Sequence, residues 1–97
     1  MVKRTREGKF NHEEKIKELT KIWERDGAKV INLKGKSPDL IVFQDNKVKC
    51  IEILTDASNW TYLGKKTVYE NLGFDEIQIF CIDRNDRNKS KVKILKY

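Results

Sequence analysis

Histidine, cysteine and long apolar runs are scarce in this chain, and each scarcity excludes a class of protein. One histidine and two cysteines cannot supply the four ligands of a structural zinc site. We interpret the two cysteines as core thiols in a reducing compartment. No apolar run approaches the roughly 18 residues of a membrane-spanning helix, and the first residues do not resemble a signal peptide. We therefore expect a cytoplasmic protein with no membrane partner.

Charge, in contrast, is abundant. Charged residues make up 37% of the 97 residues, and the formal net charge is +6. Residues 1–9 carry four basic and one acidic residue, and residues 83–97 carry six basic and two acidic residues. Basic ends around a nearly neutral body favour phosphate contacts, so we expect a nucleic-acid partner, with DNA as the first choice. The alternative is that the basic ends are solvated tails that keep the chain soluble.

The chain is long enough for one hydrophobic core. Residues 1–10 are polar, basic and aperiodic, which predicts a flexible arm, and residues 11–97 are expected to form a single domain. Asn11 offers an N-cap for a helix that Gly27 would end. The buried stripe of that helix is expected to contain Ile16, Leu19, Ile22 and Trp23.

The rest of the pattern predicts an α/β fold with a mixed central sheet flanked by two helices, in the order α-β-β-β-α-β-β. A second helix is expected from Asp56 or Ser58 to about residue 72. Its inward side chains would be Trp60, Leu63, Thr67 and Val68. Strands are expected at residues 28–33, 40–43, 48–54, 77–82 and 91–95.

Residues 37–55 form the most informative stretch, because two strands with one acid each are joined by the turn-rich residues 44–47. A two-residue or four-residue loop would place Asp39 directly opposite Glu52, whereas a three-residue loop would send the two acids to opposite faces. Like charges placed opposite one another are destabilising. Glu52 also lies inside a strand that reads as buried on both faces, where a carboxylate is costly unless it is neutralised or bound to a cation. The alternative is that Asp39 only starts a turn and Glu52 lies at a frayed edge.

This arrangement, Pro38-Asp39 followed by Glu52-Ile53-Leu54, resembles the PD-(D/E)xK nuclease superfamily, which includes archaeal Holliday junction resolvases and restriction endonucleases. The order of predicted elements over residues 11–83 is also that of its core. The resemblance implies a restriction-endonuclease-like core that binds Mg²⁺ or Mn²⁺ through Asp39, Glu52 and the carbonyl of Ile53. It also implies hydrolysis of phosphodiester bonds in DNA. The lysine that the family places two residues after the glutamate is Leu54 here.

Other residues could complete such a site. The missing lysine could come from the loop or the second helix, with Lys36, Lys65 and Lys66 as candidates. The family often places a further acid near the start of its first helix, which makes Glu13 or Glu14 a candidate. The residues expected to contact phosphates are Lys34, Lys36, Lys65, Lys66, Arg84, Arg87 and Lys89.

Three functions therefore remain open. The first is a metal-dependent DNA endonuclease, in which a homodimer would supply the two sites that cutting both strands requires. The second is a nucleic-acid-binding module on the same fold that has lost catalysis with its lysine. The third is a non-enzymatic interaction protein whose acids are structural.

Overall fold

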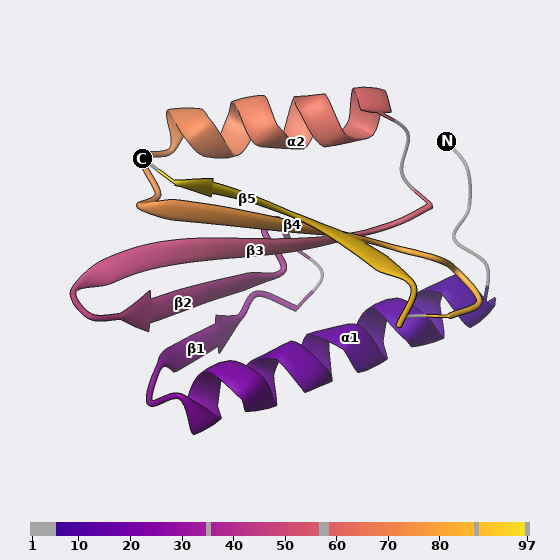
Figure 1. Cartoon of the computed structure of the whole chain (residues 1–97), viewed down its shortest axis with the longest axis horizontal. Helices are drawn as coiled ribbons and strands as arrows, with labels where there is room; N and C mark the ends of the chain where they lie inside the picture. The colour runs from indigo at the N-terminus through magenta and orange to yellow at the C-terminus, as the bar shows by residue number, and fades with distance from the viewer. Residues whose placement is uncertain (1–5, 35, 57–58, 87, 97) are drawn as a thin grey trace.

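Two helices cover opposite faces of one five-stranded mixed sheet in the computed structural model of the chain (Figure 1). The structure describes residues 6–34, 36–56, 59–86 and 88–96. Its elements are α1 (Arg6–Arg25), β1 (Lys29–Asn32), β2 (Leu40–Gln44), β3 (Lys47–Thr55), α2 (Asn59–Asn71), β4 (Glu76–Ile82) and β5 (Ser90–Lys96). The predicted α/β class and the order α-β-β-β-α-β-β are thereby confirmed. Neither helix is long and apolar enough, over the residues described, to cross a membrane.

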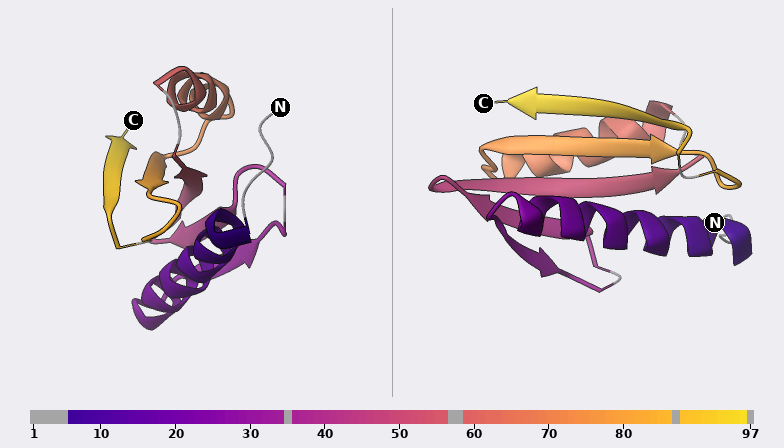
Figure 2. Two further views of the ribbon diagram at one scale, coloured as in Figure 1. Left: turned by 90° about the vertical axis from the view of Figure 1, so that its right-hand side faces the viewer. Right: turned by 60° about the horizontal axis from the view of Figure 1, so that its bottom comes forward.

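The strands lie side by side in the order β1-β2-β3-β4-β5. Only β3 and β4 are parallel, and the other neighbouring strands are antiparallel. Because parallel neighbours need a crossover connection, the chain between β3 and β4 contains α2. Figure 2 shows α1 and α2 on opposite sides of the twisted sheet. The strand expected at residues 77–82 is β4, which lies between β3 and β5.

The β2–β3 hairpin has the two-residue turn that brings the acids together. Asp45 and Asn46 occupy the turn with φ values of 53° and 63°. Asp and Asn tolerate this left-handed conformation better than most residues, and such turns match the twist of paired strands. The register pairs Phe43 with Val48 and Ile41 with Cys50, as the predicted placement of Asp39 opposite Glu52 requires. Continued beyond the start of β2, this register places Asp39 opposite Glu52.

The core has two halves, one on each face of the sheet. Side chains of β3 and β4 alternate between the halves, as the period of two in a strand requires. The half under α1 contains Ile16, Leu19, Ala28, Leu40, Val42, Ile51, Ile53, Phe80 and Ile82. The half under α2 contains Cys50, Leu54, Tyr69, Ile77 and Ile79. Burial and the nearby Glu52 raise the pKa of the Cys50 thiol to about 12, in keeping with an unreactive core thiol.

The first helix starts earlier than its expected cap. It begins at Arg6, so residues 6–10 of the predicted arm are helical, and residues 1–5 lie outside the described part of the chain. Asn11 is not an N-cap, because it lies within the helix and not at its start. Its side chain is buried, and the side-chain amide donates a 2.6 Å hydrogen bond to the carbonyl of Arg84. Ile22 was also assigned wrongly to the buried stripe, since it is exposed.

The buried face of the second helix is opposite to the face predicted from the sequence. Trp60, Leu63, Thr67 and Val68 are exposed, whereas Tyr69 is fully buried against the sheet. The predicted cap at Asp56 is also wrong, because this carboxylate accepts hydrogen bonds from Arg84, and Ser58 lies outside the described residues. The physical reason for the reversed face is the buried Glu52, to which the tyrosine face of α2 supplies a hydrogen-bond donor.

Candidate functional site

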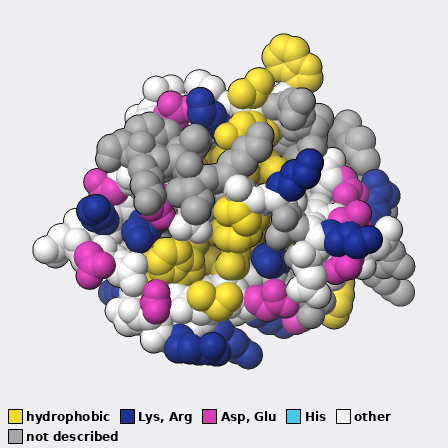
Figure 3. Space-filling model, viewed as in Figure 1, with side chains coloured by type: hydrophobic (Ala, Val, Ile, Leu, Met, Phe, Trp, Pro, Cys, Tyr) yellow, Lys and Arg dark blue, Asp and Glu magenta, His cyan; other side chains and the backbone are white. Residues whose placement is uncertain are grey.

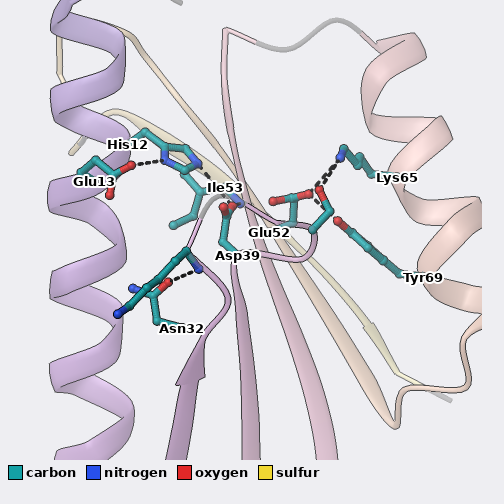
Figure 4. A network of polar contacts seen from close by, with 10 residues as sticks. His12, Glu13, Asn32, Asp39, Glu52, Ile53, Lys65 and Tyr69 are labelled. Carbon is teal, nitrogen blue, oxygen red and sulfur yellow. Dashed lines mark hydrogen bonds and ion pairs between the residues drawn. The ribbon is translucent and has the colours of Figure 1, made fainter.

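Two buried carboxyl groups lie together at the end of the sheet where β1 ends and β2 begins. Asp39 is 7% exposed and Glu52 is 3% exposed. Asp39 is placed by the loop that returns from β1, whose ends are joined by a 3.1 Å hydrogen bond from the Leu33 amide to the Asp39 carbonyl. Glu52 extends from the middle of β3 toward α2 (Figure 4). The predicted meeting of the two acids is therefore what the fold produces.

Asp39 is held from the α1 side and by its neighbouring strand. Its Oδ2 accepts a 2.8 Å hydrogen bond from the backbone amide of Ile53 and lies 3.3 Å from Nε2 of His12 (Figure 4). Because a carboxylate only accepts hydrogen bonds, the second contact assigns the imidazole proton to Nε2. Nδ1 of His12 is buried without a hydrogen-bond partner, 3.8 Å from a carboxylate oxygen of Glu13.

Glu52 is held from the α2 side. The Tyr69 hydroxyl donates a hydrogen bond to its Oε2, and the ammonium group of Lys65 lies 3.2 Å from the same oxygen. Lys65 also donates a 3.0 Å hydrogen bond to the hydroxyl of Ser37, in the loop before Asp39. Lys65 thus joins α2 to both segments that supply the acids, as Figure 4 shows for its contact with Glu52.

The two carboxyl groups change each other's proton affinity in opposite directions. Burial and the adjacent Asp39 raise the pKa of Glu52 to about 7, against the contributions of Tyr69 and Lys65. Burial alone would raise the pKa of Asp39, but hydrogen bonds from His12, Glu52 and the Ile53 amide hold it below its usual value. At pH 6 the pair therefore shares one proton, which resides on Glu52. Above about pH 7 two negative charges adjoin on side chains that are 7% and 3% exposed.

The donor set of this site fits a small divalent cation. Within the residues that the structure describes, no three or more His, Cys, Asp or Glu side chains are grouped to bind a metal ion. Mg²⁺, however, is commonly bound by one or two carboxylates while it keeps several waters. His12 and the Ile53 amide both contact Oδ2 of Asp39, Tyr69 and Lys65 both contact Oε2 of Glu52, and the two carboxyl groups are also hydrogen-bonded to each other.

The other predicted catalytic residues separate into those near the acids and those directed elsewhere. Glu13 approaches the site only through His12, and Glu14 forms an ion pair with Lys17 on the surface of α1. Lys66 pairs with Glu70 along α2, at 3.2 Å. Lys36 is exposed in the loop before Asp39. Among the three candidate lysines, Lys65 has the direct contact with an acid of the site.

The residues predicted to contact phosphates do not form one uniform patch. Lys34 and Lys36 are exposed in the loop that leads to Asp39, and Lys89 is exposed beyond β4. Arg84 is bound to Asp56, which lowers the pKa of that carboxyl group and fastens the turn after β4 to the end of β3. Arg87 lies outside the described residues. On the face in Figure 3, the side chains shown in colour place Lys and Arg among Asp and Glu.

Two residues of the site, His12 and Tyr69, carry only a weak signal in the sequence. Neither residue is among the predicted site residues. The available signal was helical spacing, because Tyr62, Lys65 and Tyr69 recur at intervals of three and four residues and so share one face of α2. Leu54, at the family's lysine position, is buried with Tyr69 in the α2 half of the core.

Comparison with known proteins adds no relative to this picture. No protein-family model, no curated protein and no solved structure matches the chain. The resemblance to PD-(D/E)xK nucleases therefore depends on the acids, their strand context and the order of elements. The structure itself establishes a small α/β domain with two helices and a five-stranded mixed sheet.

Proposed function

We propose that this chain is a divalent-metal-dependent DNA endonuclease of the PD-(D/E)xK type, with a restriction-endonuclease-like core. One observation carries the proposal. Two buried carboxyl groups from adjacent strands adjoin, and a lysine from α2 reaches one of them at 3.2 Å. In this proposal Asp39 and Glu52 are the two acids of the motif. Lys65 replaces the motif lysine, whose position in the sequence is occupied by Leu54.

In this proposal Asp39, Glu52 and the carbonyl of Ile53 hold Mg²⁺ or Mn²⁺. The cation, when bound, would activate water and stabilise charge at the scissile phosphate. His12 and the Ile53 amide fix the carboxyl group of Asp39 by bonding its Oδ2. Lys65 compensates charge on Glu52 and presents an ammonium group at the site, where it can orient a water. Lys34 and Lys36 contact the phosphates of the DNA that enters beside Asp39.

Metal binding tests the proposal without any need for activity. We expect calorimetry at pH 8 to show one Mn²⁺ site in the wild type and at least about tenfold weaker binding, or 1.4 kcal/mol, in Asp39→Asn. Plasmid, four-way-junction and single-stranded DNA should be cut by the wild type with Mg²⁺ or Mn²⁺ and left intact by Asp39→Asn. Asp45→Asn is the matched control, because the exposed turn residue has a left-handed backbone that asparagine adopts equally well.

Wild-type protein that neither binds Mn²⁺ nor cuts any of these substrates would refute the enzyme proposal. A second candidate would then remain, a nucleic-acid-binding module that does not cut. One observation favours it. The acids already have protein partners, because His12, the Ile53 amide, Tyr69 and Lys65 can satisfy them without a cation.

Both candidates require electrostatic binding of DNA through the loop before Asp39. Lys34→Ala/Lys36→Ala should flatten the plot of log affinity against log salt by about 2 units, because each phosphate contact contributes about 0.9. Lys29→Ala/Lys47→Ala removes the same charge from two exposed lysines at the opposite end of the sheet, next to the β2–β3 turn. Its slope should equal that of the wild type, and fluorescence anisotropy at several salt concentrations measures both. Equal slopes for the two double variants would show that the loop does not touch the DNA backbone.

A further inference from the structure

A positive charge from the chain itself adjoins the buried acid pair. The ammonium group of Lys65 lies 3.2 Å from Oε2 of Glu52, as Figure 4 shows, and donates a 3.0 Å hydrogen bond to the hydroxyl of Ser37. Ser37 belongs to the loop that leads into Asp39, so this one group reaches both segments that supply the acids. An ammonium group binds oxygen atoms through a compact positive charge, as a small divalent cation does. Lys65 therefore serves as a counter-ion of the pair.

The two partners of this ion pair differ in their freedom to move. The side chain of Glu52 is 4% exposed, whereas that of Lys65 is 32% exposed. Glu52 lies in the middle of β3 and is also held by the Tyr69 hydroxyl. Lys65 extends from α2 on a flexible four-carbon stem. When the ion pair opens, the lysine moves and the acid stays in place.

A divalent cation bound to the acids would compete with this ion pair. Like charges a few ångströms apart repel one another, and more strongly in a buried site than in bulk water. The ammonium group would therefore leave Glu52 as a cation takes its place. It would remain tethered to α2 beside the loop of Ser37, in which Lys36 is exposed.

The net charge of the site decides when a phosphate can enter it. With Asp39 and Glu52 ionised and His12 neutral, the two acids and Lys65 together carry one negative charge, which repels a phosphodiester. A divalent cation at the acids changes this to one positive charge. That charge matches the single negative charge that each phosphodiester of a nucleic acid carries. A cation at the acids and a phosphate at Lys65 therefore favour one another.

We propose that Lys65 is an exchangeable counter-ion, which holds Glu52 until a divalent cation binds the acids and then moves to a phosphate of the nucleic acid. Metal and nucleic acid then bind with positive cooperativity, and each raises the affinity for the other by the same factor. The inference rests on the proposed nuclease site. It concerns the order in which that site is filled, and not whether the site cuts.

Calorimetric titration with Mn²⁺ at pH 8, without nucleic acid, tests the competition. Lys65→Met keeps the apolar part of the side chain and removes the charge, so Mn²⁺ should bind at least about tenfold more tightly than to the wild type. Misfolding would weaken binding and so cannot produce this result. Lys66→Met is the matched control, because the Lys66 side chain is 35% exposed and pairs with Glu70 along α2. Its affinity for Mn²⁺ should stay within about threefold of that of the wild type.

The cooperativity is tested with a fluorescent phosphorothioate duplex, whose backbone resists hydrolysis. Fluorescence anisotropy measures its affinity for each protein in EDTA and in saturating Mn²⁺. The gain in affinity caused by Mn²⁺ should be at least about fivefold larger for the wild type than for Lys65→Met, because only the wild type has this ammonium group to release. Lys66→Met should show the gain of the wild type.

The outcomes separate this inference from the proposed function. Mn²⁺ binding to Lys65→Met that equals or falls below that of the wild type would overturn the inference, since the lysine would then not compete with the cation. Equal gains in duplex affinity for the wild type and Lys65→Met would also overturn it. Both results would leave the metal site of the proposed function in place. If neither the wild type nor Lys65→Met binds Mn²⁺, the proposed function fails and the inference fails with it.

Discussion

Lys65→Ala is expected to lower metal-dependent DNA cleavage by about 10²- to 10⁴-fold, the usual contribution of a group that assists proton transfer. The reason is geometric, because the Lys65 ammonium group lies 3.2 Å from Glu52 and 3.0 Å from the Ser37 hydroxyl. A single-turnover nicking assay with saturating Mg²⁺ measures the effect. Mn²⁺ binding should persist in this variant, which separates the loss of the lysine from the loss of the metal.

Lys66→Ala is the matched control for Lys65→Ala. It removes the same charge from the next residue, whose ammonium group pairs with Glu70 along α2. Its cleavage rate should stay close to that of the wild type. Equal losses in the two variants would mean that helix charge, and not the position of Lys65, matters for cleavage. A Lys65→Ala variant with full activity would show that Lys65 does not assist cleavage. Lys36 would then be the remaining candidate.

Glu52→Gln is expected to make the protein more stable than the wild type at pH 8 and equally stable at pH 5, in the absence of metal. The pKa of Glu52 is raised from 4.5 to about 7 in the folded chain. The folded state therefore holds a proton that the unfolded state releases between these values, so wild-type stability is lost as the pH rises from about 4.5 to 7. Glutamine does not titrate, and the difference at pH 8 should reach up to about 3 kcal/mol.

Urea unfolding of both proteins at pH 5 and pH 8 measures this difference. Glu24→Gln, at an exposed position on α1, should show no such dependence on pH. A Glu52→Gln variant that is less stable than the wild type at pH 8 would show that the ion pair with Lys65 outweighs the repulsion from Asp39. Added Mg²⁺ should recover the lost stability of the wild type at pH 8 and leave Glu52→Gln unchanged, because the cation takes the place of the proton.

Much of the site could be predicted because it depends on local geometry. The hairpin register follows from a two-residue turn, and Asp45-Asn46 favours such a turn by the conformations that these two residues tolerate. Once the register is fixed, the period of two along a strand places Asp39 opposite Glu52. Glycines after each helix marked the helix ends for the same local reason, since Gly27 and Gly73 adopt positive φ values of 86° and 80°.

The facing of α2 could not be predicted in this way. Helical spacing revealed an apolar stripe through Trp60 and Val68, and burial of apolar surface made that stripe the expected inner face. The structure turns the opposite face inward, where Tyr69 and Lys65 reach Glu52. The sequence shows which residues of a helix share a face, but which face is buried depends on the groups that the sheet presents to it.

The sequence by itself determined the order of elements, because this order depends on neighbours along the chain. It left open whether the turn has two, three or four residues, and the two-residue turn of the structure brings the two acids together. Only the tertiary structure decided which lysine serves the acids, since Lys36, Lys65 and Lys66 are equivalent in sequence terms. It likewise brought His12, from a helix 27 residues before Asp39, against the carboxyl group at 3.3 Å. A buried carboxylate needs hydrogen-bond donors. Which donors lie within reach depends on how the helices are oriented against the sheet.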